Sequence, residues 1–183
     1  MKNMKKRWAW VLTGSGHFFN ESISLINNLN NIDLFVSKAA EEVLIMYKKK
    51  KIISNKIKIY KDNTASSVPV GQFYRGIYHT LVMAPTSSNT VAKCVVGISD
   101  NLATNVFAQS GKCRVECIYF PCDTAPELKT RSPKGFVDVY PRNIDLDNVK
   151  KLEKFERTKV VLSFEELKKE IVKREQCLKK YFS

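Results

Sequence analysis

The sequence predicts a three-layer α/β fold, in which a mostly parallel β-sheet carries helices on both faces. Short apolar runs, which are typical of buried strands, alternate along the chain with segments whose apolar residues recur at helical spacing. This alternation favours a parallel sheet, because each connection between parallel strands needs room for a crossover helix. The 183 residues, 44% of them hydrophobic, suffice for one core and show neither an internal repeat nor a linker. We therefore expect a single domain over residues 1–183.

Each element is assigned from its apolar pattern and its boundary residues. In the first half we expect a strand at 8–13, a helix over 18–29, a strand at 32–36, a helix from Ser37 to about residue 47, and, within the irregular segment 48–76, a short strand at 57–60 and one turn of helix. In the second half we expect a strand at 78–84, one or two helices over 88–111, a strand at 117–120, a loop rich in Pro, Lys and Gly before a further element at 137–140, a helix at 146–155 and a short strand at 160–162. A capping box at Ser163-Phe-Glu-Glu166 then begins the last helix. Pro85 and Pro121 are expected to close the strands before them.

Small, hydroxylated or glycine residues follow three successive strands. They are Thr13-Gly14-Ser15-Gly16, then Ser37, then Pro85-Thr86-Ser87-Ser88-Asn89-Thr90. Carboxyl ends of parallel strands meet at one edge of a sheet, where backbone amides, hydroxyls and helix N-termini bind phosphate. The only lysine near these loops is Lys38, so uncharged donors would hold the phosphate. The alternative is that these are ordinary strand–helix turns whose serines cap helices.

The loop after the first strand departs from the dinucleotide-binding fingerprint. Phe19 stands where the third glycine of that motif is expected, and Ser37 stands where an acidic residue would bind the ribose hydroxyls. Both departures disfavour NAD. They favour a mononucleotide, because Ser37 would be a second phosphate donor.

Several segments together resemble a known family. Ala84-Pro-Thr-Ser-Ser-Asn-Thr90, followed by Gly97-Ile-Ser-Asp-Asn-Leu102, resembles the Pro-Ala-Ser-Ala-Asn-Thr signature of the flavin-containing cysteine-decarboxylase (HFCD) superfamily. Further similarity lies in Ala9-Trp-Val-Leu-Thr-Gly-Ser-Gly-His-Phe18, Ser37-Lys-Ala-Ala-Glu-Glu-Val43 and Pro141-Arg-Asn-Ile-Asp-Leu-Asp-Asn-Val149. Within the superfamily, the chain is most similar to the archaeal-type flavoproteins and the dihydromethanopterin reductase group.

The resemblance implies a Rossmann-like (flavodoxin-like) domain that binds FMN at a subunit interface, in a homo-oligomer that is a trimer or an assembly of trimers. It implies that Gly14, Ser15, Gly16 and Ser37 surround the phosphate, that Pro85, Thr86, Ser87, Ser88, Asn89 and Thr90 line the ribityl chain and ring, and that Pro121 and Cys122 approach the flavin.

Two departures from the decarboxylases favour redox chemistry. Their catalytic His lies about a dozen residues before the Ala-Pro of the signature; that count reaches residues 70–71 here, and His79 falls inside a strand. Pro121-Cys122-Asp123 also replaces their Pro-x-Met-Asn element. We therefore expect an FMN-dependent oxidoreductase that delivers electrons from ferredoxin or a nicotinamide to a pterin-like substrate. A non-catalytic FMN electron carrier that docks an acidic ferredoxin is the alternative, and an FMN-dependent cysteine decarboxylase is less favoured.

The net charge of +13 raises nucleic acid, anionic membrane or an anionic ligand as partners. Most of the excess comes from Lys2, Lys5, Lys6, Arg7, Lys48, Lys49, Lys50, Lys51, Lys56, Lys58 and Lys61. Aromatic residues do not interleave with these runs as they do in single-strand binders, which disfavours nucleic acid. A solvated basic surface, or one that steers an acidic partner, fits better.

The remaining candidates are weaker. His17 is placed either to touch a ligand or to pack and cap a helix, and His79 is interpreted as a core residue. Cys113, Cys117 and Cys122 match neither usual ferredoxin spacing, so we expect no metal site. Arg142 and Asp145 are interpreted as a surface ion pair, with a role as interface or substrate groups as the alternative. Five cysteines without tight pairing, and no signal peptide or membrane span, predict a cytoplasmic protein.

Overall fold

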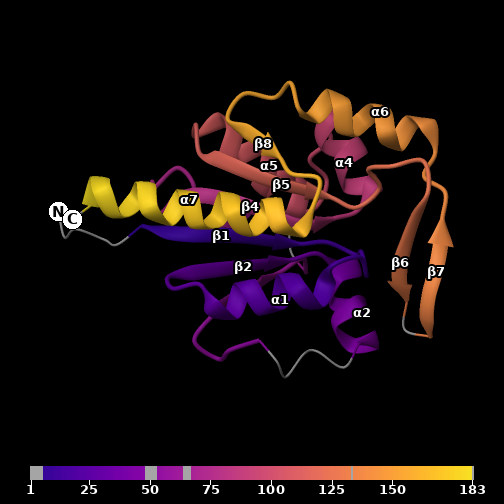
Figure 1. Cartoon of the computed structure of the whole chain (residues 1–183). Coiled ribbons are helices and arrows are strands. Elements are labelled where there is room, and N and C mark those ends of the chain that lie inside the picture. The colour runs from indigo at the N-terminus through magenta and orange to yellow at the C-terminus, as the bar shows by residue number, and fades with distance from the viewer. Residues whose placement is uncertain (1–5, 48–52, 64–66, 133, 183) are drawn as a thin grey trace.

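The structure, a computed structural model, describes residues 6–47, 53–63, 67–132 and 134–182. In this part of the chain, six parallel strands form one sheet in the order β3-β2-β1-β4-β5-β8 (Figure 1). Their bounds are β1 (Arg7–Leu12), β2 (Ile32–Val36), β3 (Lys58–Lys61), β4 (Tyr78–Thr86), β5 (Glu116–Pro121) and β8 (Thr158–Val160). The order reverses between β1 and β4, and ligands bind at such a reversal in open α/β sheets.

Helices cover both faces of this sheet, so the predicted three-layer fold is confirmed. The helices are α1 (Phe19–Asn28), α2 (Lys38–Met46), α3 (Ser67–Val70), α4 (Ser88–Val95), α5 (Leu102–Lys112), α6 (Asn143–Leu152) and α7 (Phe164–Phe182). One core lies between the sheet and α1, α2 and α7, and the other lies beneath α4, α5 and α6. Side chains of β1 alternate between them: Trp8 and Trp10 enter the first core, Ala9 and Val11 the second. Burial on both faces explains why this strand is apolar throughout.

A hairpin outside the main sheet was missed by the sequence prediction. Strands β6 (Leu128–Ser132) and β7 (Gly135–Val139) pair antiparallel with each other and not with the other strands described. The hairpin lies alongside the carboxyl-terminal edge of the sheet, where Figure 1 shows it at the right. The sequence prediction had placed a loop before residues 137–140, so it located part of β7 but neither β6 nor the pairing of the two strands.

Other boundaries also differ from prediction. The helix expected at 146–155 is α6 at 143–152, and the strand expected at 160–162 is β8 at 158–160. β4 continues through Pro85 to Thr86, so Pro85 does not close it. The expected capping box at Ser163 forms in part: the Glu166 N–H donates to Ser163 Oγ at 3.2 Å, but the Glu166 carboxylate accepts from the Leu162 N–H instead of that of Ser163.

The last helix is tied to the amino-terminal edge of the sheet. Arg174 of α7 donates to Thr80 Oγ1 at 2.8 Å and to the His79 carbonyl at 3.0 Å. The His79 ring packs edge-on against Trp8, with 4.8 Å between ring centroids. Burial, reinforced by the nearby Arg174 and Lys6 charges, lowers the pKa of His79 to about 4. His79 is therefore neutral near pH 7 and packs at the edge opposite to that expected for ligand binding.

Several basic residues of the two sequence runs have partners. Arg7 pairs with the buried Asp33 at 2.6 Å, and Lys61 pairs with Glu41 at 2.8 Å. Lys58 lies over the Tyr60 ring. Lys2, Lys5 and Lys48–Lys51 lie outside the described residues. Within the described part of the chain, no helix is both long and apolar enough to cross a membrane.

Candidate functional site

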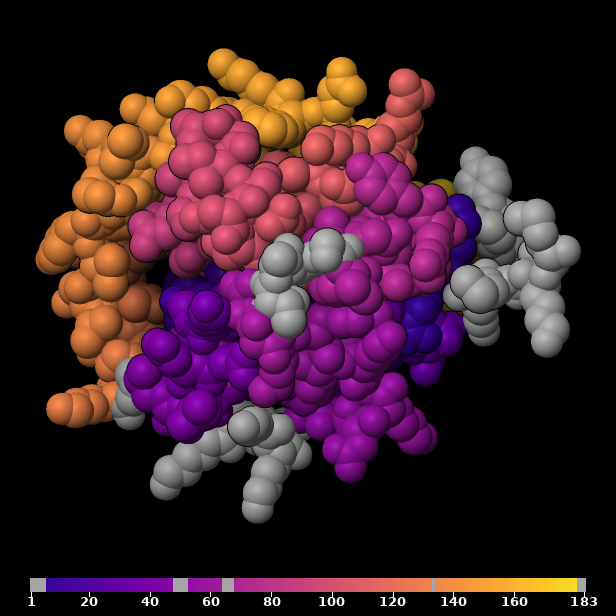
Figure 2. All heavy atoms as spheres, turned by 180° about the vertical axis from the view of Figure 1, so that it is seen from behind, coloured from indigo at the N-terminus to yellow at the C-terminus, as the bar shows by residue number. Residues whose placement is uncertain are grey.

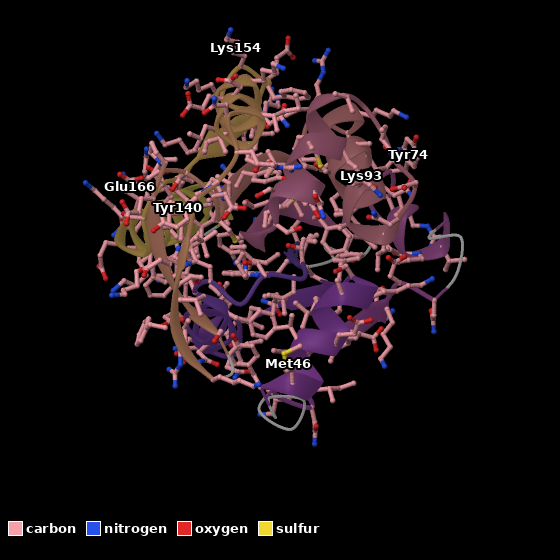
Figure 3. All side chains as sticks on the ribbon, turned by 90° about the vertical axis from the view of Figure 1, so that its right-hand side faces the viewer. Met46, Tyr74, Lys93, Tyr140, Lys154 and Glu166 are labelled. Atoms are coloured by element: carbon pink, nitrogen blue, oxygen red, sulfur yellow. The ribbon has the colours of Figure 1, made fainter. Side chains whose placement is uncertain are left out.

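A cavity of about 280 Å³ opens at the carboxyl-terminal edge of the sheet. One wall is polar and comes from the loops after β1 and β5, with Ser15, Gly16, His17, Cys122 and Asp123. The other walls are Val43, Met46 and Tyr47 of α2 and Leu128, Thr130, Arg131, Ser132 and Val139 of the hairpin. Figure 2 shows the hairpin (orange) set off from the indigo and purple segments by a hollow. Figure 3 looks onto this edge, with Met46 on α2 at one side of the opening.

Two glycines allow the β1–α1 loop to approach α2. A Cβ at Gly14 would lie 2.4 Å from Ala39 Cβ, and a Cβ at Gly16 would lie 2.5 Å from the Tyr47 hydroxyl. No larger residue fits these contacts without a shift of the helix or of Tyr47. The glycines therefore bring Tyr47 and the β1–α1 loop to the same cavity.

Ser15 and Cys122 meet in the polar wall. The Cys122 thiol donates to Ser15 Oγ at 2.9 Å, and the His17 N–H donates to the same oxygen at 3.2 Å. The Cys122 N–H donates to the Thr86 carbonyl at 3.0 Å, which fixes the β5 end against the β4 end. Burial raises the pKa of Cys122 to about 12, so the thiol stays protonated and can donate.

The β4–α4 loop lies directly behind this wall. Thr13 Oγ1 donates to the Pro85 carbonyl at 3.0 Å and accepts from the Ser87 N–H at 2.8 Å. Ser88 at the start of α4 donates its hydroxyl hydrogen to the Asp123 carboxylate. The loops after β1, β4 and β5 are thus joined by hydrogen bonds into one edge.

Ser37 has a different place. Its Oγ accepts from the Ala40 N–H at 3.1 Å, which makes it the N-cap of α2 as predicted.

The cavity lining includes Ser15, Gly16 and Cys122 from the predicted set, and Gly14, Pro85, Thr86, Ser87 and Ser88 bond or pack immediately behind it. Ser37, Asn89, Thr90 and Pro121 do not line it. The membership of all twelve residues in a ligand site stays a prediction.

Asp123 is a carboxyl group in the cavity wall with charged neighbours. Burial, together with the charge of Asp145, raises its pKa, while Arg142 acts in the opposite direction. Arg142 and Asp145 form an ion pair at 2.8 Å at the start of α6, and hydrogen bonds from Arg142 lower the pKa of Asp145. The pair expected at the surface therefore has an exposed guanidinium and a buried carboxylate, and both charges act on Asp123.

The hairpin is tied to the rest of the cavity by two side chains. The Tyr47 hydroxyl donates to the Arg131 carbonyl at 3.0 Å, and His17 Nδ1 lies 2.9 Å from Thr130 Oγ1. Burial lowers the pKa of His17, which keeps the ring neutral near pH 7. Of the two roles weighed for His17, the structure supports a place in the cavity wall.

Sequence reasoning missed the apolar and hairpin walls, although signals for both exist. Val43, Met46 and Tyr47 are spaced three and four residues apart, which places them on one helix face. Residues 128–131 alternate between Leu or Thr and a basic residue, and the next four residues, Ser-Pro-Lys-Gly, are a turn signal before 136–139. Within the described residues, no group of three or more His, Cys, Asp or Glu is placed to hold a metal.

The fold and this edge define a class of protein: an α/β domain that presents hydroxyl-rich loops at the reversal of its strand order, as nucleotide-binding domains do. The comparison with known proteins then identifies the family. A family model described as Flavoprotein matches residues 1–179, and the chain belongs to this family.

Two of the similar proteins bear most directly on a ligand or an activity. The crystal structure of Burkholderia xenovorans DmrB in complex with FMN, described as a cubic protein cage for redox transfer, is 47% identical. The match covers 98% of this chain and 99% of that one, with a TM-score of 0.86. A dihydromethanopterin reductase (acceptor) of Methanosarcina mazei is 35% identical over 142 residues, which are 70% of this chain and 59% of that protein. The chain thus spans less than two thirds of that reductase.

Other relatives extend the comparison. An uncharacterized protein of Methanocaldococcus jannaschii is 30% identical over 174 residues, covering 90% of this chain and 94% of that protein. Phenylacrylic acid decarboxylase from Aquifex aeolicus is 22% identical over 86% of this chain and 81% of that chain, with a TM-score of 0.63, which shows a shared fold.

Proposed function

We propose that this protein binds FMN at the described cavity and acts as an FMN-dependent oxidoreductase on a pterin-type substrate. The observation that carries the proposal is the cavity itself, where the loops after β1 and β5 meet in a chain 47% identical to an FMN complex over nearly its full length. The reductase relatives support a dihydropterin such as dihydromethanopterin as the substrate. Ferredoxin or a nicotinamide is the proposed electron donor.

The chemistry of the cavity fits FMN, which has a polar phosphate and ribityl end and a flat ring. Ser15 and the neighbouring loops supply uncharged donors for the polar end. Val43, Met46, Leu128 and Val139 supply an apolar surface on which a ring can pack. Gly16 and Cys122 line the cavity and complete the proposed FMN contacts within it. Gly14, Ser37, the Pro85–Thr90 loop and Pro121 would contact the parts of FMN that extend beyond it. Bound FMN would supply the hydride or single electrons, and these residues would bind and orient it.

The positions of the two histidines support redox chemistry over decarboxylation. His79 packs on Trp8 at the amino-terminal edge, and His17 is held by Thr130 in the cavity wall. Neither lies about a dozen residues before Ala84-Pro85, where the decarboxylases carry their catalytic His.

The cavity size supports assembly into a homo-oligomer. A volume of about 280 Å³ lies just below the range of about 300–1,000 Å³ for small-molecule sites, so one chain would enclose FMN only in part. Phe136 and Tyr140, 70% and 69% exposed, lie on and just after the hairpin that borders the cavity. We propose that a second copy covers this apolar surface in a trimer or an assembly of trimers. Light scattering of the purified protein tests this.

A non-catalytic FMN carrier is the second candidate, and the net charge of +13 favours it. A basic protein would be steered toward an acidic ferredoxin, and that association would weaken as salt rises. This candidate predicts salt-sensitive reduction by the partner without turnover of a pterin.

The decisive experiment has two stages. The purified protein is first examined by absorption spectroscopy, with the released cofactor identified by mass; we expect a flavin spectrum and FMN. The FMN-loaded protein is then reduced without oxygen and mixed with dihydromethanopterin. Reoxidation of the flavin with formation of the tetrahydro product supports the oxidoreductase. Reoxidation by a ferredoxin alone supports the carrier, and a colourless protein that takes up no FMN contradicts both.

A further inference from the structure

The Ser15 hydroxyl is surrounded by donors. A serine oxygen has two lone pairs and one hydrogen. The His17 N–H occupies one lone pair at 3.2 Å, and the Cys122 thiol occupies the other at 2.9 Å. Within the described part of the chain, no group accepts the hydrogen of this hydroxyl. Since Ser15 lines the cavity, that hydrogen is left for a ligand.

The direction of the thiol contact follows from the surroundings of Cys122. Its side chain is 5% exposed, and its raised pKa keeps it protonated. Its backbone is held by the bond from its N–H to the Thr86 carbonyl. Sulfur is a weak acceptor, and the acceptor that this thiol contacts is Ser15 Oγ, at 2.9 Å. The S–H therefore points to Ser15.

We propose that Cys122 is a positioning residue that fixes the Ser15 hydroxyl as a donor toward an anionic oxygen in the cavity. The inference rests on the proposed function, and it assigns that oxygen to the phosphate of FMN. A thiol that donates to Ser15 prevents the hydroxyl from turning its hydrogen toward the β5 end. The loop thereby binds an anion with an uncharged side chain whose direction is set before the ligand arrives.

The test is a double-mutant cycle on the protein stripped of cofactor. Binding of FMN and of riboflavin, which lacks the phosphate, is measured by flavin fluorescence for the wild type, S15A, C122A, C122S and the S15A/C122A double variant. C113A is the control, because Cys113 is a half-buried thiol at the end of α5 and away from the cavity. Thermal denaturation of each variant verifies folding.

Loss of a hydrogen bond to a charged group weakens binding about 10- to 100-fold, and loss of a neutral one about 5-fold. We therefore expect S15A to weaken FMN binding about 10- to 100-fold and C122A about 5-fold, with riboflavin affected little. In the S15A background, C122A should cause no further loss, because its partner is gone. C122S should restore binding, since its hydroxyl can donate to Ser15. C113A should bind as the wild type does.

Three results would overturn the inference. An equal loss from C122A with and without Ser15 would mean that Cys122 acts by packing. Equal losses for FMN and riboflavin would mean that the hydroxyl does not serve the phosphate. Neither result touches the proposed function, because FMN would still bind to the wild type. A wild type that binds neither flavin would overturn the proposed function and this inference with it. If C122A fails to fold, FMN binding by C122S is compared with that by S15A: C122S should bind FMN as the wild type does, and S15A should bind it more weakly.

Discussion

Gly14 sets how closely α2 approaches the β1–α1 loop. In G14A the new Cβ would lie 2.4 Å from Ala39 Cβ and 3.2–3.3 Å from the Ala39 backbone, so the helix must move. We expect a loss of about 1–3 kcal/mol in the free energy of unfolding, typical of overpacking, measured by urea denaturation.

G111A is the matched control for this change. Gly111 lies in α5 and a Cβ there meets nothing within 4 Å. Alanine in a helix is favoured over glycine by roughly 1 kcal/mol or less, so G111A should keep or raise stability. Equal losses in the two variants would contradict the close approach described for Gly14.

Asp123 makes stability depend on pH with a defined sign. Its pKa is raised in the folded protein by burial and by Asp145, so the folded state holds the proton more tightly than the unfolded state. Its contribution to stability is full below the unfolded pKa and declines as pH rises through the folded value. D123N removes this decline. In thermal denaturation at pH 4.5, 6 and 8, the melting temperature of D123N relative to that of the wild type should rise with pH. A difference in melting temperature that is the same at all three pH values would contradict the role given to Asp123.

At the residue scale, the sequence predicted the loops better than their contacts. Ser15, Gly16 and Cys122 were expected at a ligand site and line one cavity. Asp123 entered only as a departure from a motif, because its surroundings depend on Ser88 and Asp145, which come from two other helices. Distances of this kind are set by tertiary packing and leave no local pattern.

At the scale of elements, two serines at helix N-caps differ in whether they cap the helix with a hydrogen bond. Ser37 caps α2 by accepting from the Ala40 N–H, whereas Ser87, the N-cap residue of α4, makes no side-chain cap bond to the backbone. S37A should cost about 1 kcal/mol in the free energy of unfolding of the cofactor-free protein, and S87A should cost less. Chemical denaturation compares them. A larger loss in S87A would show that the α4 serine has the stronger structural role.

The hairpin depends on its ties to the rest of the molecule, because two isolated antiparallel strands are marginally stable in water. Y47F removes the bond from the Tyr47 hydroxyl to the Arg131 carbonyl, worth about 1 kcal/mol. Amide hydrogen exchange over residues 128–139 should become faster, with the main sheet unchanged. Y74F, which alters a tyrosine that is 70% exposed, is the control and should leave the hairpin exchange as it is.

The elements that could be predicted are those that bury an apolar pattern. The second strand was predicted at 32–36 and is found there, because all five of its side chains are buried. The hairpin was missed because neither strand buries an apolar pattern: β6 alternates between half-buried and exposed positions with Leu128 as its one apolar residue, and most of β7 is exposed. Its order comes from Tyr47 and His17, which are distant in sequence.

At the scale of the whole molecule, His79 links acid stability to the docking of α7. Its pKa of about 4 lies below the usual 6.5, so the unfolded chain takes up a proton that the folded protein excludes. The stability it contributes is present above pH 6.5 and is lost as pH falls toward 4, on the order of 2–3 kcal/mol. H79Q should lose less over this interval.

Urea denaturation of the wild type and of H79Q at pH 7, 5.5 and 4.5 measures the difference in their loss of stability. The carboxylates that titrate in the same pH range are present in both proteins, so their contribution cancels in the comparison. Parallel losses in the two proteins would contradict the role of His79. We also propose that residues 1–183 form one domain, and a single cooperative transition in these experiments is the expected result.

The two outermost strands of the main sheet bear on the behaviour of the protein at high concentration. β3 and β8 are four and three residues long, and Lys58, Lys61 and Lys159 on them are exposed. A strand from another molecule that paired with β3 or β8 would form only a few backbone hydrogen bonds, and its backbone would lie beside these ammonium groups. Lysines on these two strands thus disfavour fibril-like stacking of the sheet, independently of the ligand bound at its carboxyl-terminal edge.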